Sequence, residues 1–259
     1  FTIHNLLYQS ARMWYQVPTE LRDTGRGAPE FSAEKLATMN FAARGIRYAD
    51  IISTVSERYA QEILTKKFGE GLDPLLRKRR DRLFGIIHGI DYVVNNPSVD
   101  PNLTTHFDWN SLDKKAENKR QFQKEFGLDQ SNAIPVIGMA HRFTEQKGFN
   151  LLMEILPTLM QQPVQLIVTG FGEKKYLSFF RQAIKKYPRQ IAVHFEFSGY
   201  MASRIYASSD LFLMPSRFEP CGMSQFRNLR YWSIPIVLNP GVLAVTVTSF
   251  VPVHSVLYG

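Results

Sequence analysis

The chain has 259 residues, of which 44% are hydrophobic and 21% are charged, and its formal net charge is +8. This composition is that of a folded globular protein and excludes a disordered or fibrous one. The single cysteine, Cys221, excludes an intrachain disulfide, and the six histidines show no metal-ligand spacing. No run of 18 apolar residues is present, so we expect neither a metal site nor a membrane partner.

The basic residues are densest at 77–82, where the sequence reads RKRRDR. No aromatic residue interrupts this run, whereas sites for single-stranded nucleic acid combine cations with rings that stack on the bases. Two nearby acids, Asp73 and Asp81, indicate a solvated helix end. We therefore expect no nucleic-acid partner.

Taken in chain order, short apolar runs alternate with helical patterns. The predicted strands are residues 1–3, 50–56, 83–87, 133–140, 164–169, 191–195, 210–214 and 234–238. The predicted helices are residues 33–48, 57–65, 112–126, 148–161, 173–186, 200–208 and 222–231. Residues 95–110 are rich in Asn, Pro, Asp and Thr and predict a linking loop.

The strands after residue 130 are separated by single helices, a pattern typical of a doubly wound parallel sheet. The earlier residues predict part of a second unit of the same kind. We expect an α/β protein with two Rossmann-like domains, residues 1–125 and 126–259, both incomplete. The chain starts inside a predicted strand, and residues 231–259 contain no Asp, Glu, Lys or Arg, so we expect a piece of a longer protein.

Two strand-to-helix loops carry the side chains best suited to chemistry. Arg142 and Lys147 follow the strand at 133–140, and Glu219 follows the strand at 210–214. Loops at strand C-termini face the crevice of an open α/β sheet, and the helix predicted to begin near Cys221 would direct free N–H groups at an anion there. An Arg fork and a Lys charge can together stabilise a departing diphosphate.

Several of these residues have a structural alternative. Glu219 either faces a substrate or caps the next helix, where an acid is favoured by the helix dipole. His4 and His88 are either satisfied core histidines or polar groups that reach into a cleft. The turn at 170–172 has only two glycines, which makes it a weak phosphate fingerprint.

Longer stretches resemble one known family. FTIHNLLYQS at 1–10, YADIISTVSERYAQEI at 48–63, HRFTEQKG at 141–148 and RIYASSDLFLMPSRFEPCGMSQ at 204–225 are similar to segments of bacterial glycogen synthase and plastid starch synthase, and they occur in the same order. The resemblance implies a GT-B fold of glycosyltransferase family 5. It also implies cofactor-free transfer of glucose, with retention, from ADP-glucose to the non-reducing end of an α-1,4-glucan such as glycogen or starch.

The resemblance implies roles for individual residues. Arg142 and Lys147 correspond to the pair that grips the diphosphate, and Glu219 to the carboxylate that faces the donor glucose. Phe197 corresponds to the aromatic residue that stacks on adenine, and His4 to a cleft residue that meets the sugar from the other domain. The further donor contacts are expected from Asn5 beside His4, from the backbone N–H groups of Cys221, Gly222 and Met223, and from Ser224 near the phosphates.

The chain also departs from the family pattern. The N-terminal Lys-Thr-Gly-Gly loop of the family is absent, and its Thr-Gly-Gly-Leu-x-Asp-Thr-Val stretch reads NPGVLAVTV at 239–247. An Asn of the family is His88 here, and a Gly-rich stretch reads YWS at 231–233. Three hypotheses stay open: a fragment of an ADP-glucose synthase, a non-catalytic relative that binds glucan or nucleotide sugar, and a synthase that uses UDP-glucose. We expect the isolated chain to be inactive, because GT-B chemistry needs two closed domains, and we expect a bacterial cytoplasm or a plastid stroma as its location.

Overall fold

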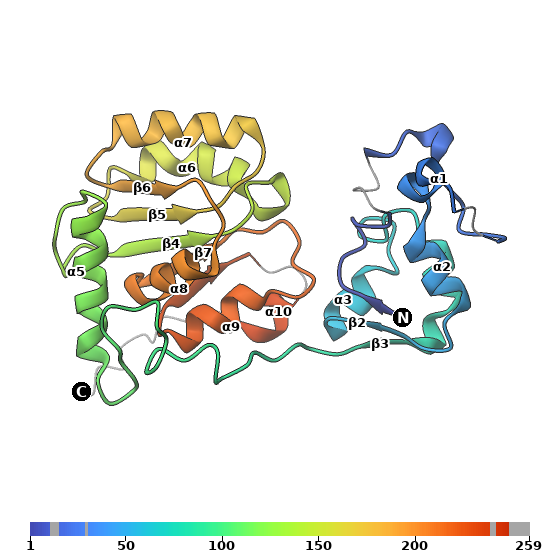
Figure 1. Ribbon diagram of the computed structural model, residues 1–259, viewed down its shortest axis with the longest axis horizontal. Helices are drawn as coiled ribbons and strands as arrows, with labels where there is room; N and C mark the ends of the chain where they lie inside the picture. Colours follow the sequence, from blue (N-terminus) through green and yellow to red (C-terminus); the bar gives the residue numbers. More distant parts are fainter. Residues whose placement is uncertain (11–15, 29–30, 239–241, 249–259) are drawn as a thin grey trace, which may run out of the picture.

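Two parallel sheets organise the computed structural model, which describes residues 1–10, 16–28, 31–238 and 242–248 (Figure 1). The N-terminal lobe holds three strands in the order β1-β2-β3, and the C-terminal lobe holds five in the order β6-β5-β4-β7-β8. The strands are β1 (Thr2–Ile3), β2 (Ile52–Thr54), β3 (Leu83–Gly85), β4 (Val136–Ala140), β5 (Gln165–Thr169), β6 (Ile191–His194), β7 (Leu211–Met214) and β8 (Ile234–Val237). The segment 86–111 runs along one side of the molecule from β3 to the C-terminal lobe.

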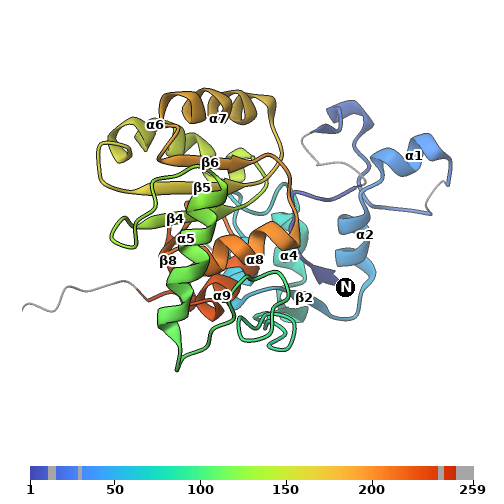
Figure 2. The same cartoon turned by 60° about the vertical axis from the view of Figure 1, so that its left-hand side comes forward.

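The sheet of the C-terminal lobe is covered on both faces (Figures 1 and 2). On one face lie α6 (Phe149–Leu159) and α7 (Lys174–Lys186), and on the other lie α5 (Lys115–Glu125), α8 (Gly199–Ser208) and α9 (Met223–Arg230). Every residue of β4 and β5 is buried, which explains why β4 is a continuous apolar run and why the centre of β5 is apolar. The prediction of an α/β protein with a doubly wound parallel sheet is confirmed.

The strand order of this sheet reverses between β4 and β7. These two strands are parallel neighbours, with Ile137 opposite Leu211, although β5 and β6 lie between them in the chain. The loops 141–148 and 215–222, which follow β4 and β7, therefore lie on the two sides of a topological switch point. Ligands of doubly wound proteins bind at such a point.

The N-terminal lobe packs α2 (Phe41–Tyr48), α3 (Glu57–Glu62) and α4 (Asp73–Lys78) against its three strands. The single helix predicted at 33–48 is wrong, because the chain breaks into α1 (Ala33–Thr38) and α2. Met39 is extended, and the side chain of Asn40 caps α2 by accepting a hydrogen bond from Ala43 N at 2.8 Å. An Asn side chain is preferred at the start of a helix and disfavoured in its interior. The periodicity of the apolar residues contains no information about this preference, so it predicted one continuous helix.

Two short helices were not among the predicted ranges, although Asp73 and Asp81 indicated a helix end near the first of them. The first, α4, follows a turn with two glycines, Gly69 and Gly71, and has Pro74 at its start, where a missing N–H costs nothing. The second, α10 (Leu243–Thr246), lies within the uncharged segment, and residues 239–241 before it lie outside the described residues. None of the helices in the described ranges has both the length and the apolar character needed to span a bilayer.

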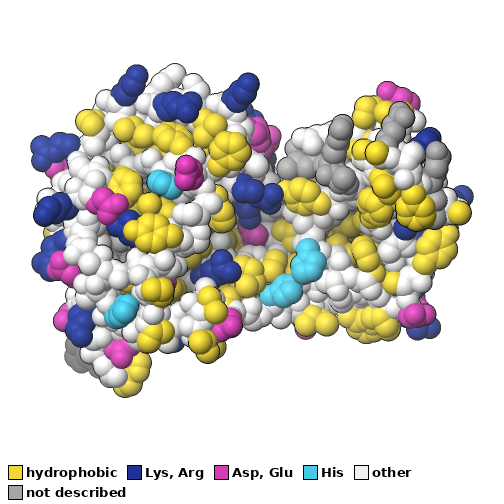
Figure 3. Space-filling model, viewed as in Figure 1, with side chains coloured by type: hydrophobic (Ala, Val, Ile, Leu, Met, Phe, Trp, Pro, Cys, Tyr) yellow, Lys and Arg dark blue, Asp and Glu magenta, His cyan; other side chains and the backbone are white. Residues whose placement is uncertain are grey.

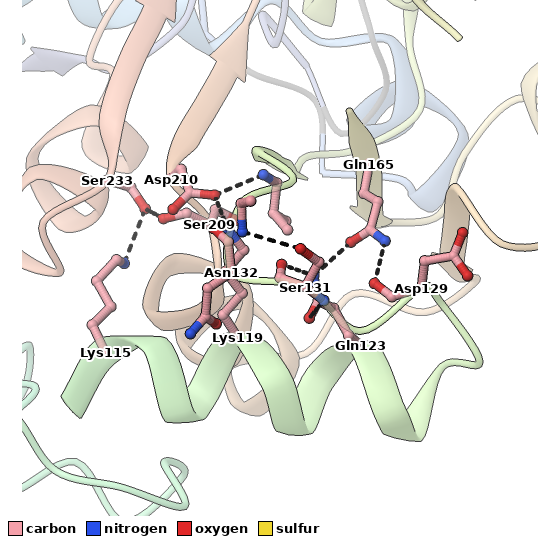
Figure 4. A network of polar contacts seen from close by, with 12 residues as sticks. Lys115, Lys119, Gln123, Asp129, Ser131, Asn132, Gln165, Ser209, Asp210 and Ser233 are labelled. Atoms are coloured by element: carbon pink, nitrogen blue, oxygen red, sulfur yellow. Dashed lines mark hydrogen bonds and ion pairs between the residues drawn. The ribbon is translucent and has the colours of Figure 1, made fainter. Parts of the chain in front are cut away.

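Helix α5 is fixed to the C-terminal lobe by two lysines, Lys119, which is buried, and Lys115, which is half-buried (Figure 4). Lys119 pairs with Asp210 at 2.7 Å, and that carboxylate also accepts a hydrogen bond from Val136 N. Lys115 donates to backbone carbonyls near the ends of α8 and α9, at 2.8 to 3.1 Å. Burial lowers the pKa of Lys115 to about 7, a shift that Asp210 opposes and Lys119 increases.

Large apolar side chains remain exposed on the N-terminal lobe, where Figure 3 shows extensive hydrophobic surface. Tyr48, Phe84 and Ile86 belong to this exposed set. Phe84 and Ile86 lie in or beside β3, an outer strand of its sheet. Exposed apolar surface around a sheet edge is typical of a contact surface.

Candidate active site at the switch point

A cavity of about 830 Å³ opens at the switch point of the larger sheet. Its walls come from the loops after β4, β5, β6 and β7, which all leave the same edge of the sheet, and from Gln16 of the N-terminal lobe. The volume is within the roughly 300–1,000 Å³ typical of sites for small molecules and cofactors. The topology therefore brings four loops, distant in sequence, to one binding site.

Eight of the ten residues singled out from the sequence line this cavity. They are Arg142, Lys147, Phe197, Glu219, Cys221, Gly222, Met223 and Ser224. The other two, His4 and Asn5, line a separate cavity of about 250 Å³ in the N-terminal lobe. There the His4 ring stacks on His88 with centroids 5.5 Å apart, and Asn5 Oδ1 accepts a hydrogen bond from Leu7 N.

Glu219 is buried and accepts three hydrogen bonds. Its Oε2 accepts from Lys147 Nζ at 2.5 Å and from Ser216 Oγ at 2.9 Å, and its Oε1 accepts from Gly222 N at 3.3 Å. Glu219 contacts the backbone at the start of the next helix and also lines the cavity, so its contact with the helix leaves it in a position where it could face a ligand. Three donors hold the carboxylate in one orientation, and the ammonium group compensates its charge.

Two glycines shape the loops that carry these groups. Gly148 has φ of 75°, and a Cβ on it would lie only 1.9 Å from the carbonyl oxygen of Pro215. Gly222 has φ of 61° and precedes α9, which begins at Met223, one residue later than the predicted helix at 222–231. The first glycine lets the loops after β4 and β7 touch, and the second turns the chain so that the start of α9 lines the cavity.

Arg142 and Phe197 present exposed groups at the cavity. Arg142 Nη1 donates a hydrogen bond to the hydroxyl of Tyr8 in the N-terminal lobe at 2.6 Å. The side chain of Phe197, which follows β6, is 57% exposed, so the ring is free to stack on a planar ligand. A cationic group, a buried carboxylate and an exposed ring thus line the same cavity.

The electrostatics of the cavity keep two of its groups neutral. Burial lowers the pKa of His141 well below its usual range, and the charge of Lys147 lowers it further against a hydrogen bond to the Leu213 backbone. Burial also raises the pKa of the Cys221 thiol to about 11, with Glu219 adding to the shift and Lys147 opposing it. Near pH 7 the imidazole is therefore uncharged and the thiol is protonated, so neither changes the charge that a ligand meets.

Sequence reasoning missed several residues of the site, namely Tyr8, Gln16, His141, Thr144 and Ser216. Tyr8, His141 and Thr144 lie in the same short stretches as residues that were chosen, so proximity in the chain was the available signal. Ser216 contacts Glu219 from three residues away, and only the turn between them reveals this. Among the described residues, no three side chains of His, Cys, Asp or Glu gather as metal ligands would.

Family models match both parts of the chain. Residues 1–78 match the starch synthase catalytic domain, and residues 120–251 match the glycosyl transferases group 1. The chain is 46% identical over 253 residues to the glycogen synthase of Clostridium novyi, covering 96% of this chain and 52% of that protein. It is 43% identical over 255 residues to the glycogen synthase of Pseudothermotoga lettingae, covering 97% of this chain and 52% of that protein.

Solved structures have the same fold. The catalytic domain of starch synthase IV from Arabidopsis thaliana, bound to ADP and acarbose, superposes with a TM-score of 0.82 at 30% identity and covers 96% of this chain and 52% of that chain. Sucrose-phosphate synthase from Thermosynechococcus elongatus superposes with a TM-score of 0.57 at 16% identity, covering 95% and 51%, which shows the shared GT-B fold alone. The chain spans about half the length of the curated relatives that it matches. It belongs to the glycogen and starch synthase family, in the glycosyl transferases group 1.

Proposed function

We propose that the protein is a retaining glucosyltransferase that moves glucose from ADP-glucose to the non-reducing end of an α-1,4-glucan. One observation carries the proposal: Arg142, Lys147 and the buried Glu219 line one cavity at the switch point. Two cations suit a diphosphate, and a fixed carboxylate beside them suits a sugar that develops positive charge. The relatives named glycogen synthase support the same substrates.

The cations take the diphosphate. The guanidinium of Arg142 offers a planar fork to phosphate oxygens, and the ammonium of Lys147 has three N–H donors, of which Glu219 occupies one. When the bond between the anomeric carbon and the phosphate oxygen breaks, its electron pair goes to the departing ADP. Both cations stabilise the charge that accumulates there.

Glu219 acts on the sugar electrostatically. Three donors already occupy its oxygens, which makes it a poor nucleophile and a well-fixed negative charge. The other carboxylate of the cavity, Glu173, is exposed and pairs with Lys175, so no second buried carboxylate among the lining residues serves a double displacement. We therefore favour attack by the acceptor hydroxyl on the face from which ADP leaves, with its proton passing to the departing phosphate.

Phe197 supports a nucleotide donor, since its exposed ring can stack on a base. Stacking alone does not distinguish adenine from uracil, so UDP-glucose is the competing donor. Arabidopsis starch synthase IV, 30% identical to this chain, was solved with ADP, which favours ADP-glucose. A location in the cytoplasm of a bacterium or in a plastid stroma belongs to the same proposal.

Calorimetric titration of the 259-residue chain with ADP-glucose and with UDP-glucose tests the proposal. We expect ADP-glucose to bind at least about tenfold more tightly, and Phe197→Ala to weaken its binding about tenfold, because stacking on one base contributes roughly 1–3 kcal/mol. Phe197→Tyr keeps the ring and is the matched control. Tighter binding of UDP-glucose would favour the UDP-glucose alternative, equal binding would contradict the preference for ADP-glucose, and binding of neither would refute the proposal.

Turnover is a separate matter from donor binding. A GT-B enzyme assembles its reaction site between two closed domains, and this chain covers about half the length of its relatives. We therefore expect the 259-residue chain to bind donor without elongating a glucan. Label from ADP-[14C]glucose appearing in precipitated glycogen with this chain alone would contradict that expectation.

A further inference from the structure

Tyr8 of the N-terminal lobe contacts the catalytic arginine of the C-terminal lobe. Its hydroxyl accepts the hydrogen bond from Arg142 Nη1 at 2.6 Å, and its ring centroid lies 5.5 Å from the guanidinium carbon. The two residues are 134 positions apart in the chain. We propose that Tyr8 is a positioning residue that orients Arg142 for the donor diphosphate, an inference that rests on the proposed function.

The chemistry of the pair suits this role. A long exposed Arg side chain samples many rotamers, and fixing it on binding weakens the affinity for the ligand. A phenol hydroxyl and a ring face hold the guanidinium through one hydrogen bond and a cation–π contact. The guanidinium has five N–H donors, so one bond to Tyr8 leaves a fork for the phosphate oxygens.

A neutral partner also preserves the charge of the arginine. Among the described residues, none of the ion pairs includes Arg142, whereas Lys147 is paired with Glu219. A carboxylate in the place of Tyr8 would orient the guanidinium equally well but would compete with the diphosphate for it. Tyr8 therefore fixes the direction of the guanidinium and leaves its positive charge for the ligand.

Tyr8 is itself held in place by a hydrogen-bonded turn at residues 5–8. Asn5 Oδ1 accepts a hydrogen bond from Leu7 N at 3.0 Å, and the Asn5 carbonyl accepts one from Tyr8 N at 3.2 Å. Leu6 before it is buried in the core of the N-terminal lobe. Gln9 after it is buried and donates from Nε2 to the Glu70 carbonyl at 2.8 Å. Anchors on both sides make Tyr8 a fixed contact and give Asn5 a part in presenting it.

The contact ties donor binding to the arrangement of the lobes. Arg142 lies after β4 of the C-terminal lobe, and Tyr8 follows β1 of the N-terminal lobe. If Tyr8 acts through Arg142, its loss weakens ligands that carry a diphosphate and leaves adenosine unaffected. If Tyr8 contributes only to folding, its loss affects both ligands alike.

A double-mutant cycle on ADP binding by the 259-residue chain tests the inference. We expect Tyr8→Phe to raise the Kd for ADP about fivefold in the wild-type background, the usual effect of losing one hydrogen bond of average strength, and to leave it unchanged in the Arg142→Ala background. Tyr8→Leu removes the ring as well and should weaken ADP further. Tyr48→Phe, an exposed tyrosine away from the cavity, is the matched control.

The outcomes separate this inference from the proposed function. Equal loss of ADP affinity in both backgrounds, or a parallel loss of adenosine affinity, would overturn the role of Tyr8. If the wild-type chain binds ADP and neither Tyr8→Phe nor Tyr8→Leu changes the Kd, the role of Tyr8 is overturned. The proposed function is then still supported. A wild-type chain that binds no ADP would overturn both.

Discussion

Lys147 Nζ lies 2.5 Å from Glu219 Oε2, so a cation from the loop after β4 and a carboxylate from the loop after β7 form one ion pair across the switch point. Both side chains are largely buried, at 14% and 7% exposure. A buried pair of this kind adds little net stability, and removing one partner leaves the other charge uncompensated. The pair is therefore better explained by ligand binding than by folding.

Loss of one charge should destabilise the chain more than loss of both. We expect Lys147→Met to lower the free energy of unfolding by about 3 kcal/mol, because it leaves Glu219 buried and unpaired. Adding Glu219→Gln should restore part of that loss, since no buried charge then remains. Urea denaturation of the wild type, both single variants and the double variant measures the coupling, and additive losses would show that the two groups act independently.

Glu219→Gln should separate binding from transfer. The amide keeps the size of the side chain but removes the negative charge that we propose acts on the donor sugar. In a protein that spans the length of its relatives, we expect kcat to fall at least about 100-fold, the usual effect of losing one preorganised electrostatic group, with donor affinity within about threefold of wild type. Glu173→Gln at the exposed rim is the control and should change kcat less than about threefold.

Turnover of the Glu219→Gln variant at the wild-type rate would contradict the assigned role. Incorporation of label from ADP-[14C]glucose into glycogen measures this rate. Circular dichroism of the same preparation establishes that the variant is folded.

Gly148→Ala should destabilise the chain well beyond the cost of a left-handed residue. A Cβ there would meet the carbonyl oxygen of Pro215 at 1.9 Å, so the two loops of the site must separate. Gly127 has a similar φ of 67° with nothing within 4 Å of an added Cβ, so Gly127→Ala isolates the backbone strain. We expect losses of about 1 kcal/mol for Gly127→Ala and about 3 kcal/mol for Gly148→Ala, and equal losses would show that the close approach does not matter.

Stability should rise with pH between about 7 and 9 through Lys115. Its pKa is about 7 in the folded chain and near 10.5 when exposed, so in this range the unfolded state binds more protons than the folded one. The free energy of unfolding therefore increases with pH, by up to about 1.4 kcal/mol per unit, and levels off below pH 7 where both states are protonated. The raised pKa of Cys221, about 11 from 9, acts in the opposite direction only above about pH 9.

Lys115→Met should remove this slope. The variant has no group that titrates at this position and also lacks the hydrogen bonds to three backbone carbonyls. Its loss of stability relative to the wild type should therefore grow as the pH rises from 7 to 9. Urea unfolding of both chains at several pH values between 6 and 9 measures the difference in slope. Parallel curves would show that Lys115 stays protonated in the folded state.

The sequence was sufficient for the C-terminal lobe because its signals are local and redundant. Strand β4 is an uninterrupted apolar run and β5 has an apolar centre, and each is followed by a helix with one apolar face. The order of the strands also places the loops of Arg142 and Glu219 on either side of the crevice. That these side chains share a cavity was therefore predictable from the pattern.

The N-terminal lobe was harder to predict, and the reasons are specific. The break between α1 and α2 depends on one side chain, Asn40, which caps the second helix inside an otherwise continuous apolar pattern. The contact between Tyr8 and Arg142 joins residues in different lobes, so no local pattern encodes it. His4 and Asn5 line a cavity of the N-terminal lobe in this structure, and their contact with the donor sugar stays a prediction.

The most direct test of the account is a crystal structure of this chain with ADP bound. We predict the diphosphate within hydrogen-bond distance of both Arg142 and Lys147, with the adenine ring against Phe197 and the start of α9 facing the phosphates. ADP at another surface, or with its diphosphate turned away from both cations, would contradict the assignment of this cavity as the donor site.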